Sequence, residues 1–281
     1  MSAQPKQKNR VINMYEIIDT PFSSVKTVRL EDGEDFRPCA TGVDVDELKV
    51  RTLMEDLEGR AGIGGGLAIA SAAHIDKQES VKNSREEAIE RVSLAAWWAL
   101  DRPFVDQVSN EQIALILRKN KIVIPGDYSV CVGYVESIDP GYHVACAIMT
   151  NSQQYPFAVL GGGCSASGER AAEKAIFESF QSWTASDWIR KNRKPEERGY
   201  WDTGELYRRS RQLLEFTNAD MGTDHHSFSS AKSVFDNLKV RSTFFDGTYI
   251  TEVIAPNAMH SSSVLLARLA MRHDERITVF T

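Results

Sequence analysis

The stretch GGGCSASGERAAEKAIFESFQSW, residues 161–183, joins a glycine run and a short polar segment to an amphipathic pattern. Its alanines and large apolar residues recur at helical spacing, which predicts a helix with one buried face. Within this apolar frame Glu178 and Gln181 stand three residues apart, so their side chains share one helix face. The pattern therefore predicts a helix that directs two oxygen-bearing side chains toward one point.

A weak internal repeat occurs earlier in the chain. The run GIGGG at 62–66 precedes a predicted helix, SREEAIERVSLAAWWALD at 84–101, in which Glu87 and Glu90 also stand three apart. If the two helices face each other, four oxygen ligands converge, and a hard cation such as Mg²⁺ uses such ligands beside nucleotide phosphates.

The residues alone leave a second interpretation of these acidic pairs open. Taken by itself, EEAIER is typical of the solvated face of an amphipathic helix. The segment VSLAAWWAL that follows is apolar nearly all round, which predicts that this helix is largely buried. Buried carboxylates are costly without a partner, and a metal ion would supply one.

Composition excludes several classes of protein. The 281 residues suffice for one large domain or two small ones, and the net charge of -6 without a basic block disfavours nucleic-acid binding. No run approaches the roughly 20 apolar residues of a membrane span, and the polar N-terminus does not resemble a signal peptide. We expect a cytoplasmic protein with a flexible tail at 1–12 and a single domain at 13–281. The cysteines lack CxxC spacing and are expected as small buried residues: Cys39, Cys131, Cys146 and Cys164.

The predicted elements indicate an α+β fold with helices packed on a largely antiparallel sheet. Segments 127–138, 142–151 and 157–163 are typical of three successive strands, with Asp139-Pro140-Gly141 as the first turn. Helices are predicted over 43–62 and 109–120, and the last segment, SSSVLLARLAM at 261–271, is also predicted as a helix. No βαβ run long enough for a doubly wound sheet is present.

Three motifs resemble the YcaO family of ATP-dependent peptide-modifying enzymes. NSREEAIERVS at 83–93 and the stretch 161–183 are similar to its two signature helices, of which the second ends in Glu-x-x-Gln. GTYITEVIAPNAMH at 247–260 resembles the strand that ends in a Pro-Gly-Leu-Glu corner. The motifs occur in family order, and the likeness covers roughly residues 55–262.

The resemblance implies a site between two pseudo-symmetric halves. It implies Mg²⁺ ligands at Glu87, Glu90, Glu178 and Gln181. It places nucleotide-binding residues at Arg91 and Lys174 for the phosphates, at Asn83 where the family usually has Ser, and at the glycine segments that contain Gly65 and Gly162. The implied cofactors are ATP and Mg²⁺.

The implied chemistry is ATP-dependent activation of a peptide backbone amide in a ribosomally made peptide. A side-chain nucleophile would give an azoline (a thiazoline or oxazoline), sulfide a thioamide, and an amine an amidine. The implied partners are a precursor peptide and an E1-like or ocin-ThiF-like protein that binds its leader. The resemblance also allows a flavin dehydrogenase, and the sequence leaves a homodimer open.

One departure from the family pattern favours a different function. PNAM at 256–259 lacks the glycine and the glutamate of the family corner, which suits a degenerate, non-catalytic subunit that binds peptide or partner within a larger synthetase. An unrelated glycine-rich nucleotide binder is disfavoured because no P-loop or GxGxxG fingerprint occurs. Other polar motifs are expected as a capped loop at 224–226, a structural histidine at His260, and a solvated stripe at Arg268, Arg272 and Arg276.

Overall fold

The computed structural model describes residues 14–31, 38–61, 68–99, 103–151, 153, 158–192, 249–254 and 259–265. The predicted tail, the segment 224–226 and the arginine stripe lie outside these ranges. The described elements are β1 (Tyr15–Asp19), β2 (Lys26–Leu30), β3 (Cys39–Gly42), α1 (Val45–Ala61), β4 (Ala68–His74), α2 (Lys77–Ala99), β5 (Asp106–Gln107), α3 (Asn110–Lys119), β6 (Tyr128–Val135), β7 (His143–Asn151), β8 (Ala158–Ser165), α4 (Gly168–Asn192), β9 (Tyr249–Ile254) and β10 (Met259–Leu265).

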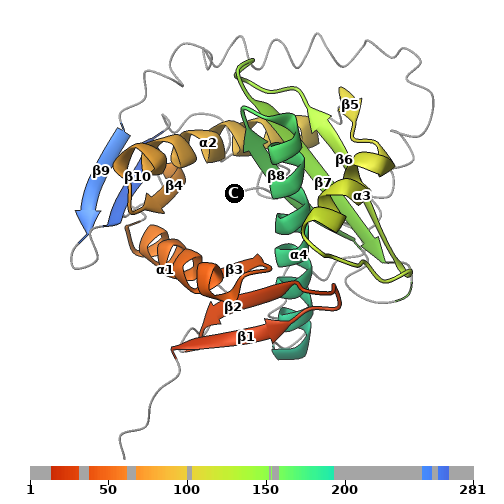
Figure 1. Cartoon of the computed structure of the whole chain (residues 1–281). Coiled ribbons are helices and arrows are strands. Elements are labelled where there is room, and N and C mark those ends of the chain that lie inside the picture. The colour runs from red at the N-terminus through yellow and green to blue at the C-terminus, as the bar shows by residue number, and fades with distance from the viewer. Residues whose placement is uncertain are drawn as a thin grey trace, which may run out of the picture.

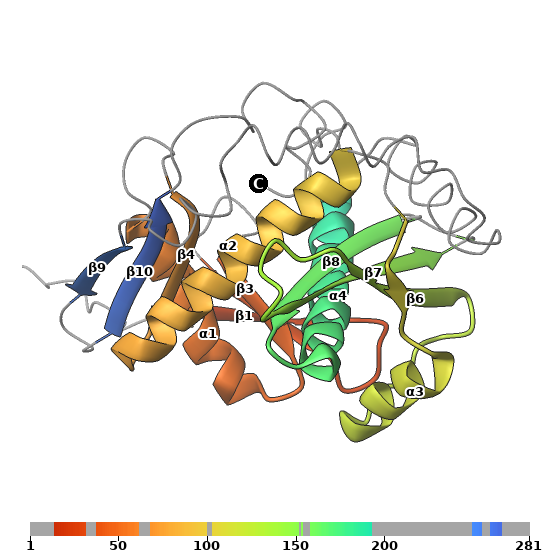
Figure 2. The same ribbon diagram turned by 90° about the horizontal axis from the view of Figure 1, so that it is seen from above.

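The described strands form three sheets, in which every pairing is antiparallel. Their orders are β1-β2-β3, β4-β10-β9 and β5-β6-β7-β8 (Figure 1). The view from above shows α2 crossing from the β4-β10-β9 sheet to the β5–β8 sheet (Figure 2). The predicted α+β class with largely antiparallel sheet is thus confirmed, whereas the pseudo-symmetry of its halves stays a prediction.

Helix starts and turns follow local sequence signals. Ser109 caps α3 and forms a capping box with Gln112, as the cap position of the predicted helix requires. Asp139 accepts a hydrogen bond from the Gly141 N–H at 2.9 Å and so closes the predicted turn between β6 and β7. None of the helices in the described part of the chain is long and apolar enough to cross a membrane.

One predicted helix is wrong. Residues 261–265, expected within the helix at 261–271, belong to strand β10, which pairs with β4 on one side and β9 on the other. Each side supplies a ladder of backbone hydrogen bonds, and this gain outweighs the weak helical preference of the segment. Tertiary pairing, which the local pattern does not contain, decides this element.

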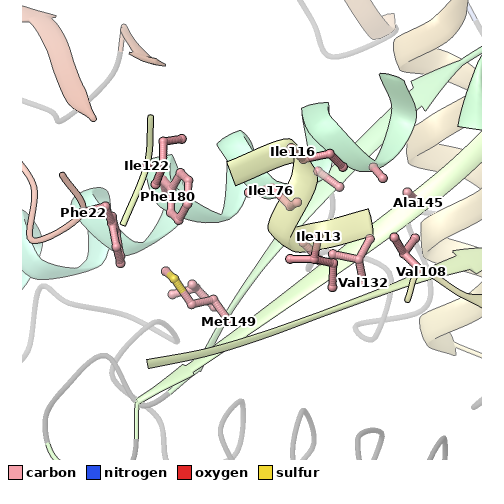
Figure 3. Close-up of a cluster of buried hydrophobic side chains, with 14 of the residues drawn as sticks. Phe22, Val108, Ile113, Ile116, Ile122, Val132, Ala145, Met149, Ile176 and Phe180 are labelled. Carbon is pink, nitrogen blue, oxygen red and sulfur yellow. The ribbon is translucent and has the colours of Figure 1, made fainter. Parts of the chain in front are cut away.

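The main core lies between α4 and one face of the β5–β8 sheet. Because successive strand residues point to opposite faces, Ala145, Ala147 and Met149 of β7 face α4 together with Val159 of β8. Ile176 and Phe180 of α4 and Ile113 and Ile116 of α3 close this core, as Figure 3 shows. The tryptophans Trp97 and Trp183 are also buried, as expected of core residues.

The glycine run of β8 serves close helix packing on both faces of this strand. A Cβ on Gly161 would lie 2.2 Å from the Ala175 carbonyl oxygen, and a Cβ on Gly163 would lie 2.1 Å from that of Ala171, so α4 packs directly on the strand backbone. A Cβ on Gly162, which points the other way, would lie 2.5 Å from Glu90 Oε1 of α2. The run therefore holds α2 and α4 against opposite faces of β8.

Candidate functional site

Helix α4, the acidic helix that carries Glu178 and Gln181, meets the β5–β8 sheet at its edge. Glu178 of α4 accepts a hydrogen bond from the Gly162 N–H through Oε2 at 3.0 Å. In the described ranges β8 pairs only with β7, so this carboxylate lies at the free edge of the sheet. Gln181 follows less than one turn further along α4 and is half-buried.

Helix α2, the acidic helix that carries Glu87 and Glu90, brings Glu90 to the same glycine, Gly162. Its carboxyl lies against the Gly162 backbone on the face of β8 that is opposite α4. Burial raises the pKa of Glu90 well above its usual range, and the negative charges of Glu178 and Glu87 raise it further. Two of the four predicted ligands, one from each helix, therefore meet around one strand residue.

The other predicted site residues of α2 lie along the same helix as Glu90. Glu87 forms an ion pair with Arg91 one turn along the helix. Asn83 lies one turn before Glu87 and is half-buried. Gly65 falls outside the described ranges, so its predicted contact with a nucleotide stays a prediction.

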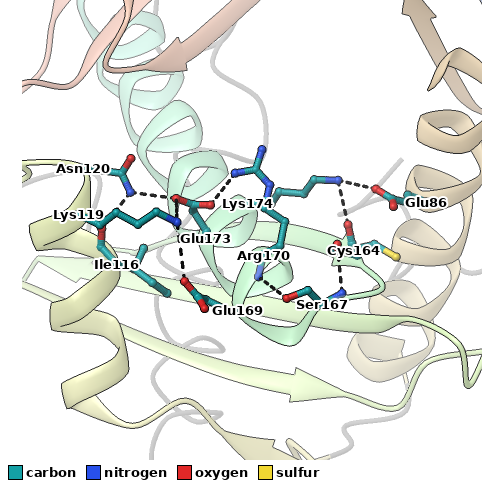
Figure 4. Close-up of polar contacts among 11 residues, drawn as sticks. Glu86, Ile116, Lys119, Asn120, Cys164, Ser167, Glu169, Arg170, Glu173 and Lys174 are labelled. Carbon is teal, nitrogen blue, oxygen red and sulfur yellow. Dashed lines mark hydrogen bonds and ion pairs between the residues drawn. The ribbon is translucent and has the colours of Figure 1, made fainter. Parts of the chain in front are cut away.

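Lys174 of α4 points toward α2 and is held there by two oxygens. Its Nζ lies 2.6 Å from Glu86 Oε2 and 2.9 Å from the carbonyl oxygen of Cys164, as Figure 4 shows. Both basic residues predicted to bind phosphate thus contact carboxylates of α2 in this structure, Arg91 that of Glu87 and Lys174 that of Glu86.

The carboxylate and amide oxygens of these residues suit a hard cation that also binds the phosphates of a nucleotide. Carboxylate and amide oxygens are the ligands that Mg²⁺ prefers, and Mg²⁺ keeps several positions for water or phosphate oxygens. In the part of the chain that is described, no group of three or more His, Cys, Asp or Glu side chains is arranged to hold a metal on its own. Glu178 and Glu87 both repel a negative charge on Glu90, and a cation beside these carboxylates would offset that repulsion. The residues therefore fit a magnesium-nucleotide complex better than a bare ion.

Two acidic residues near this site were missed in the sequence. Glu86, the partner of Lys174, lies one position before Glu87 and four before Glu90, so its spacing to Glu90 was a usable signal. Glu58 of α1 accepts a hydrogen bond from the Ala73 N–H of β4 at 2.6 Å. Its closeness to Glu87 follows from the packing of α1, which no local pattern indicates.

Glu58 predicts an unusual dependence of stability on pH. Burial, and then the charge of Glu55, raise the pKa of Glu58 from 4.5 to about 9. Between these two values the folded protein keeps a proton that the unfolded chain has released, so stability falls as pH rises through this window. We expect E58Q, which keeps an acceptor oxygen but does not titrate, to be about 2 kcal/mol more stable than wild type at pH 9.

Urea unfolding at pH 5, 7 and 9 measures this difference, which should shrink toward pH 5. E47Q is the matched control, because Glu47 lies on the same helix and is exposed. Stability curves of wild type and E58Q that run parallel between pH 5 and 9 would show that Glu58 titrates normally.

The surroundings of the three cysteines in the β5–β8 sheet do not favour a reactive thiolate. Cys146 and Cys164 are buried, as expected, whereas Cys131 is partly exposed. Burial raises the pKa of all three thiols, and nearby carboxylates raise those of Cys146 and Cys164 further. A thiolate is therefore disfavoured at these positions, and none of them has the surroundings of a nucleophile.

Solved structures with the same fold are known. The YcaO protein from Methanopyrus kandleri, solved with AMPPCP and Mg²⁺, is 16% identical, with a TM-score of 0.55 and coverage of 88% of this chain and 84% of that one. A chain of the E. coli microcin synthetase McbBCD complex is 11% identical, with a TM-score of 0.61 and coverage of 90% and 87%. At these identities the likeness concerns the fold.

A comparison with curated protein sequences finds no match. Residues 70–259, more than half of the chain, match the family described as YcaO cyclodehydratase, ATP- and Mg²⁺-binding. ATP and Mg²⁺, the cofactors expected from the sequence, are those of this family. The matched range includes both acidic helices and the glycine edge between them, so the chain belongs to the YcaO family.

Proposed function

We propose that this protein activates a backbone amide of a peptide with magnesium-bound ATP. The observation that carries the proposal is the meeting of Glu90 and Glu178, from two different helices, at the backbone of Gly162. Family membership supports ATP and Mg²⁺ as the cofactors, and we propose that these carboxylates hold the Mg²⁺.

The acidic side chains would hold the cation, and the cation would neutralise the phosphates. Glu87 and Glu90 would contribute ligands from α2, while Glu178 and Gln181 would contribute ligands from α4. Arg91 would support the phosphates from the side of Glu87. Mg²⁺ supplies charge stabilisation for the transferred phosphoryl group, which is the main requirement of such reactions.

The proposed reaction converts the amide oxygen, which is a poor leaving group, into phosphate, which is a good one. A nucleophile adds to the carbonyl carbon of the peptide bond, and the carbonyl oxygen takes the γ-phosphoryl group of ATP, which releases ADP. The carbon–oxygen bond then breaks, and the oxygen departs as part of inorganic phosphate. With a Ser, Thr or Cys side chain as the nucleophile the product is an azoline, with sulfide a thioamide, and with an amine an amidine.

The peptide substrate is proposed to come from a ribosomally made precursor, presented in the cytoplasm by a leader-binding partner. The McbBCD complex to which the fold is similar has also been solved with pro-MccB17 bound. We propose an E1-like or ocin-ThiF-like protein as the leader-binding partner, with a flavin dehydrogenase where an azoline is oxidised further.

Calorimetric titration of ATP into the protein, with and without Mg²⁺, tests the proposal. We expect saturable binding that requires Mg²⁺ at protein concentrations of about 100 μM. ADP and phosphate release in the presence of precursor peptide and partner then tests the chemical step. An absence of Mg²⁺-dependent binding, alone and with a candidate partner, would contradict the proposal.

A non-catalytic role within a synthetase is the second candidate. The observation that favours it is PNAM at 256–259, which replaces the glycine and glutamate of the family corner. Such a subunit would bind peptide or partner without consuming ATP. Binding of the partner without any nucleotide turnover by the complex would favour this candidate over the enzyme.

A further inference from the structure

An ion pair with a buried carboxylate and a partly exposed lysine joins the two helices that carry the acidic pairs. Lys174 Nζ of α4 lies 2.6 Å from Glu86 Oε2 of α2 and 2.9 Å from the carbonyl oxygen of Cys164 in β8 (Figure 4). The Glu86 side chain is only 6% exposed, so loss of Lys174 would leave a buried acidic group without its ion-pair partner. The contact therefore links α2, α4 and the strand between them at a single point.

The ion pair lies next to the proposed ligands on both helices. Glu86 stands four residues before Glu90, and Lys174 stands four residues before Glu178, so each pair of positions shares one helix face. One turn, about 5.4 Å, thus separates each end of the ion pair from a ligand position. The ion pair thus connects the two helices close to the point where Glu90 and Glu178 meet Gly162.

Lys174 already uses two of its three N–H donors, one on the Glu86 carboxylate and one on the Cys164 carbonyl oxygen. These two acceptors hold the side chain between α2 and β8, so its contacts in this structure are those of a link between the elements.

We propose that the Glu86–Lys174 ion pair is a positioning element that sets the distance between the metal-binding edges of α2 and α4. Lys174 is then a positioning residue and not a phosphate ligand, which differs from the role that the family resemblance implies. The inference rests on the proposed Mg²⁺-ATP site and adds two residues, of which Glu86 was not expected, to the machinery of that site.

The two roles of Lys174 predict opposite effects of E86Q. If the pair positions the helices, E86Q loosens them and raises the Mg²⁺ concentration for half-maximal ATP binding about 10-fold, as loss of an outer-shell partner typically does. K174M should have an effect of similar size, and K174R should remain within about 3-fold of wild type. If Lys174 binds phosphate directly, E86Q frees it, and ATP affinity rises.

Calorimetric ATP titrations at several Mg²⁺ concentrations separate these outcomes. Tighter ATP binding by E86Q, or loss of binding by K174M with E86Q unchanged, would overturn the proposal. K82M is the matched control, because Lys82 forms an exposed ion pair with Glu79 on the same helix. We expect K82M to leave the Mg²⁺ dependence unchanged.

Thermal unfolding without nucleotide gives a second readout that does not depend on ATP. E86Q and K174M should each lower Tm by several degrees, and the double variant should melt no lower than the less stable single variant. A Tm loss in the double variant that equals the sum of the losses in the two single variants would show that Glu86 and Lys174 act independently. This result would reject the proposal even if wild type binds Mg²⁺-ATP. Absence of Mg²⁺-ATP binding by wild type would instead reject the proposed function, and with it the site that the pair is proposed to position.

Discussion

Replacement of Glu178 by alanine is expected to abolish Mg²⁺-dependent ATP binding, with a loss of at least about 100-fold in affinity. Loss of an outer-shell partner of a metal costs about 10–100-fold, and Glu178 is proposed to be a direct ligand. Its Oε2 lies at the Gly162 N–H, where the two acidic helices approach each other. Calorimetry on wild type and E178A at fixed Mg²⁺ measures the loss.

The fold should survive this change, because the Glu178 side chain is exposed and its negative charge repels the carboxylate of Glu90. We expect the Tm of E178A without nucleotide to stay within about 2 °C of wild type, as for other surface substitutions. E178Q, which keeps an acceptor for the Gly162 N–H, should retain more binding than E178A. E169A is the matched control on an exposed position of α4, and equal binding by E169A and E178A would contradict the assignment.

Replacement of Gly161 by alanine is expected to destabilise the protein by about 3 kcal/mol or more, a large share of the 5–15 kcal/mol of a typical domain. The added Cβ would lie 2.2 Å from the Ala175 carbonyl oxygen and 2.2 Å from the Ser179 backbone nitrogen. These are backbone atoms of α4, so the contact cannot be relieved by a side-chain rotation. The free energy of unfolding in urea measures the effect.

Two other glycines test whether the effect is specific to this contact. G126A adds a Cβ with nothing within 4 Å and should change stability by less than about 0.5 kcal/mol. G162A meets the ends of the Glu90 and Leu94 side chains and not helix backbone, so it should destabilise the fold less than G161A while it disturbs Mg²⁺-ATP binding through Glu90. A stable G161A protein would show that α4 can move away from β8, which would contradict the close packing described above.

Local patterns predicted the four described helices and the successive strands β6, β7 and β8 correctly, whereas β10 was predicted as a helix. The apolar spacing around Ile176 and Phe180 predicts a buried helix face, and α4 packs that face on the sheet. The alternation in 142–151 predicts a strand, and β7 is that strand. These predictions hold because each element buries a face whose period is written in its own residues.

Other features depend on residues far apart in the sequence. The approach of a nucleotide to the glycine segment stays a prediction, and the structure adds a reason for Gly161 and Gly163 that the sequence did not show, which is the approach of α4 to β8. The strand β10 takes its structure from two partners, of which β4 lies nearly two hundred residues earlier. The partner of Lys174 is likewise 88 residues away, so its identity could not follow from spacing on one helix.

The sequence by itself determined that this protein has two acidic helices, an α+β fold and the motifs of the YcaO family. It determined them because helix faces, strand alternation and motif spacing are short-range properties of the chain. Only the tertiary structure decided that Glu90 and Glu178 meet at Gly162, and that Lys174 contacts Glu86. Those contacts depend on how closely two helices approach one strand, and that distance is set by packing across the whole fold.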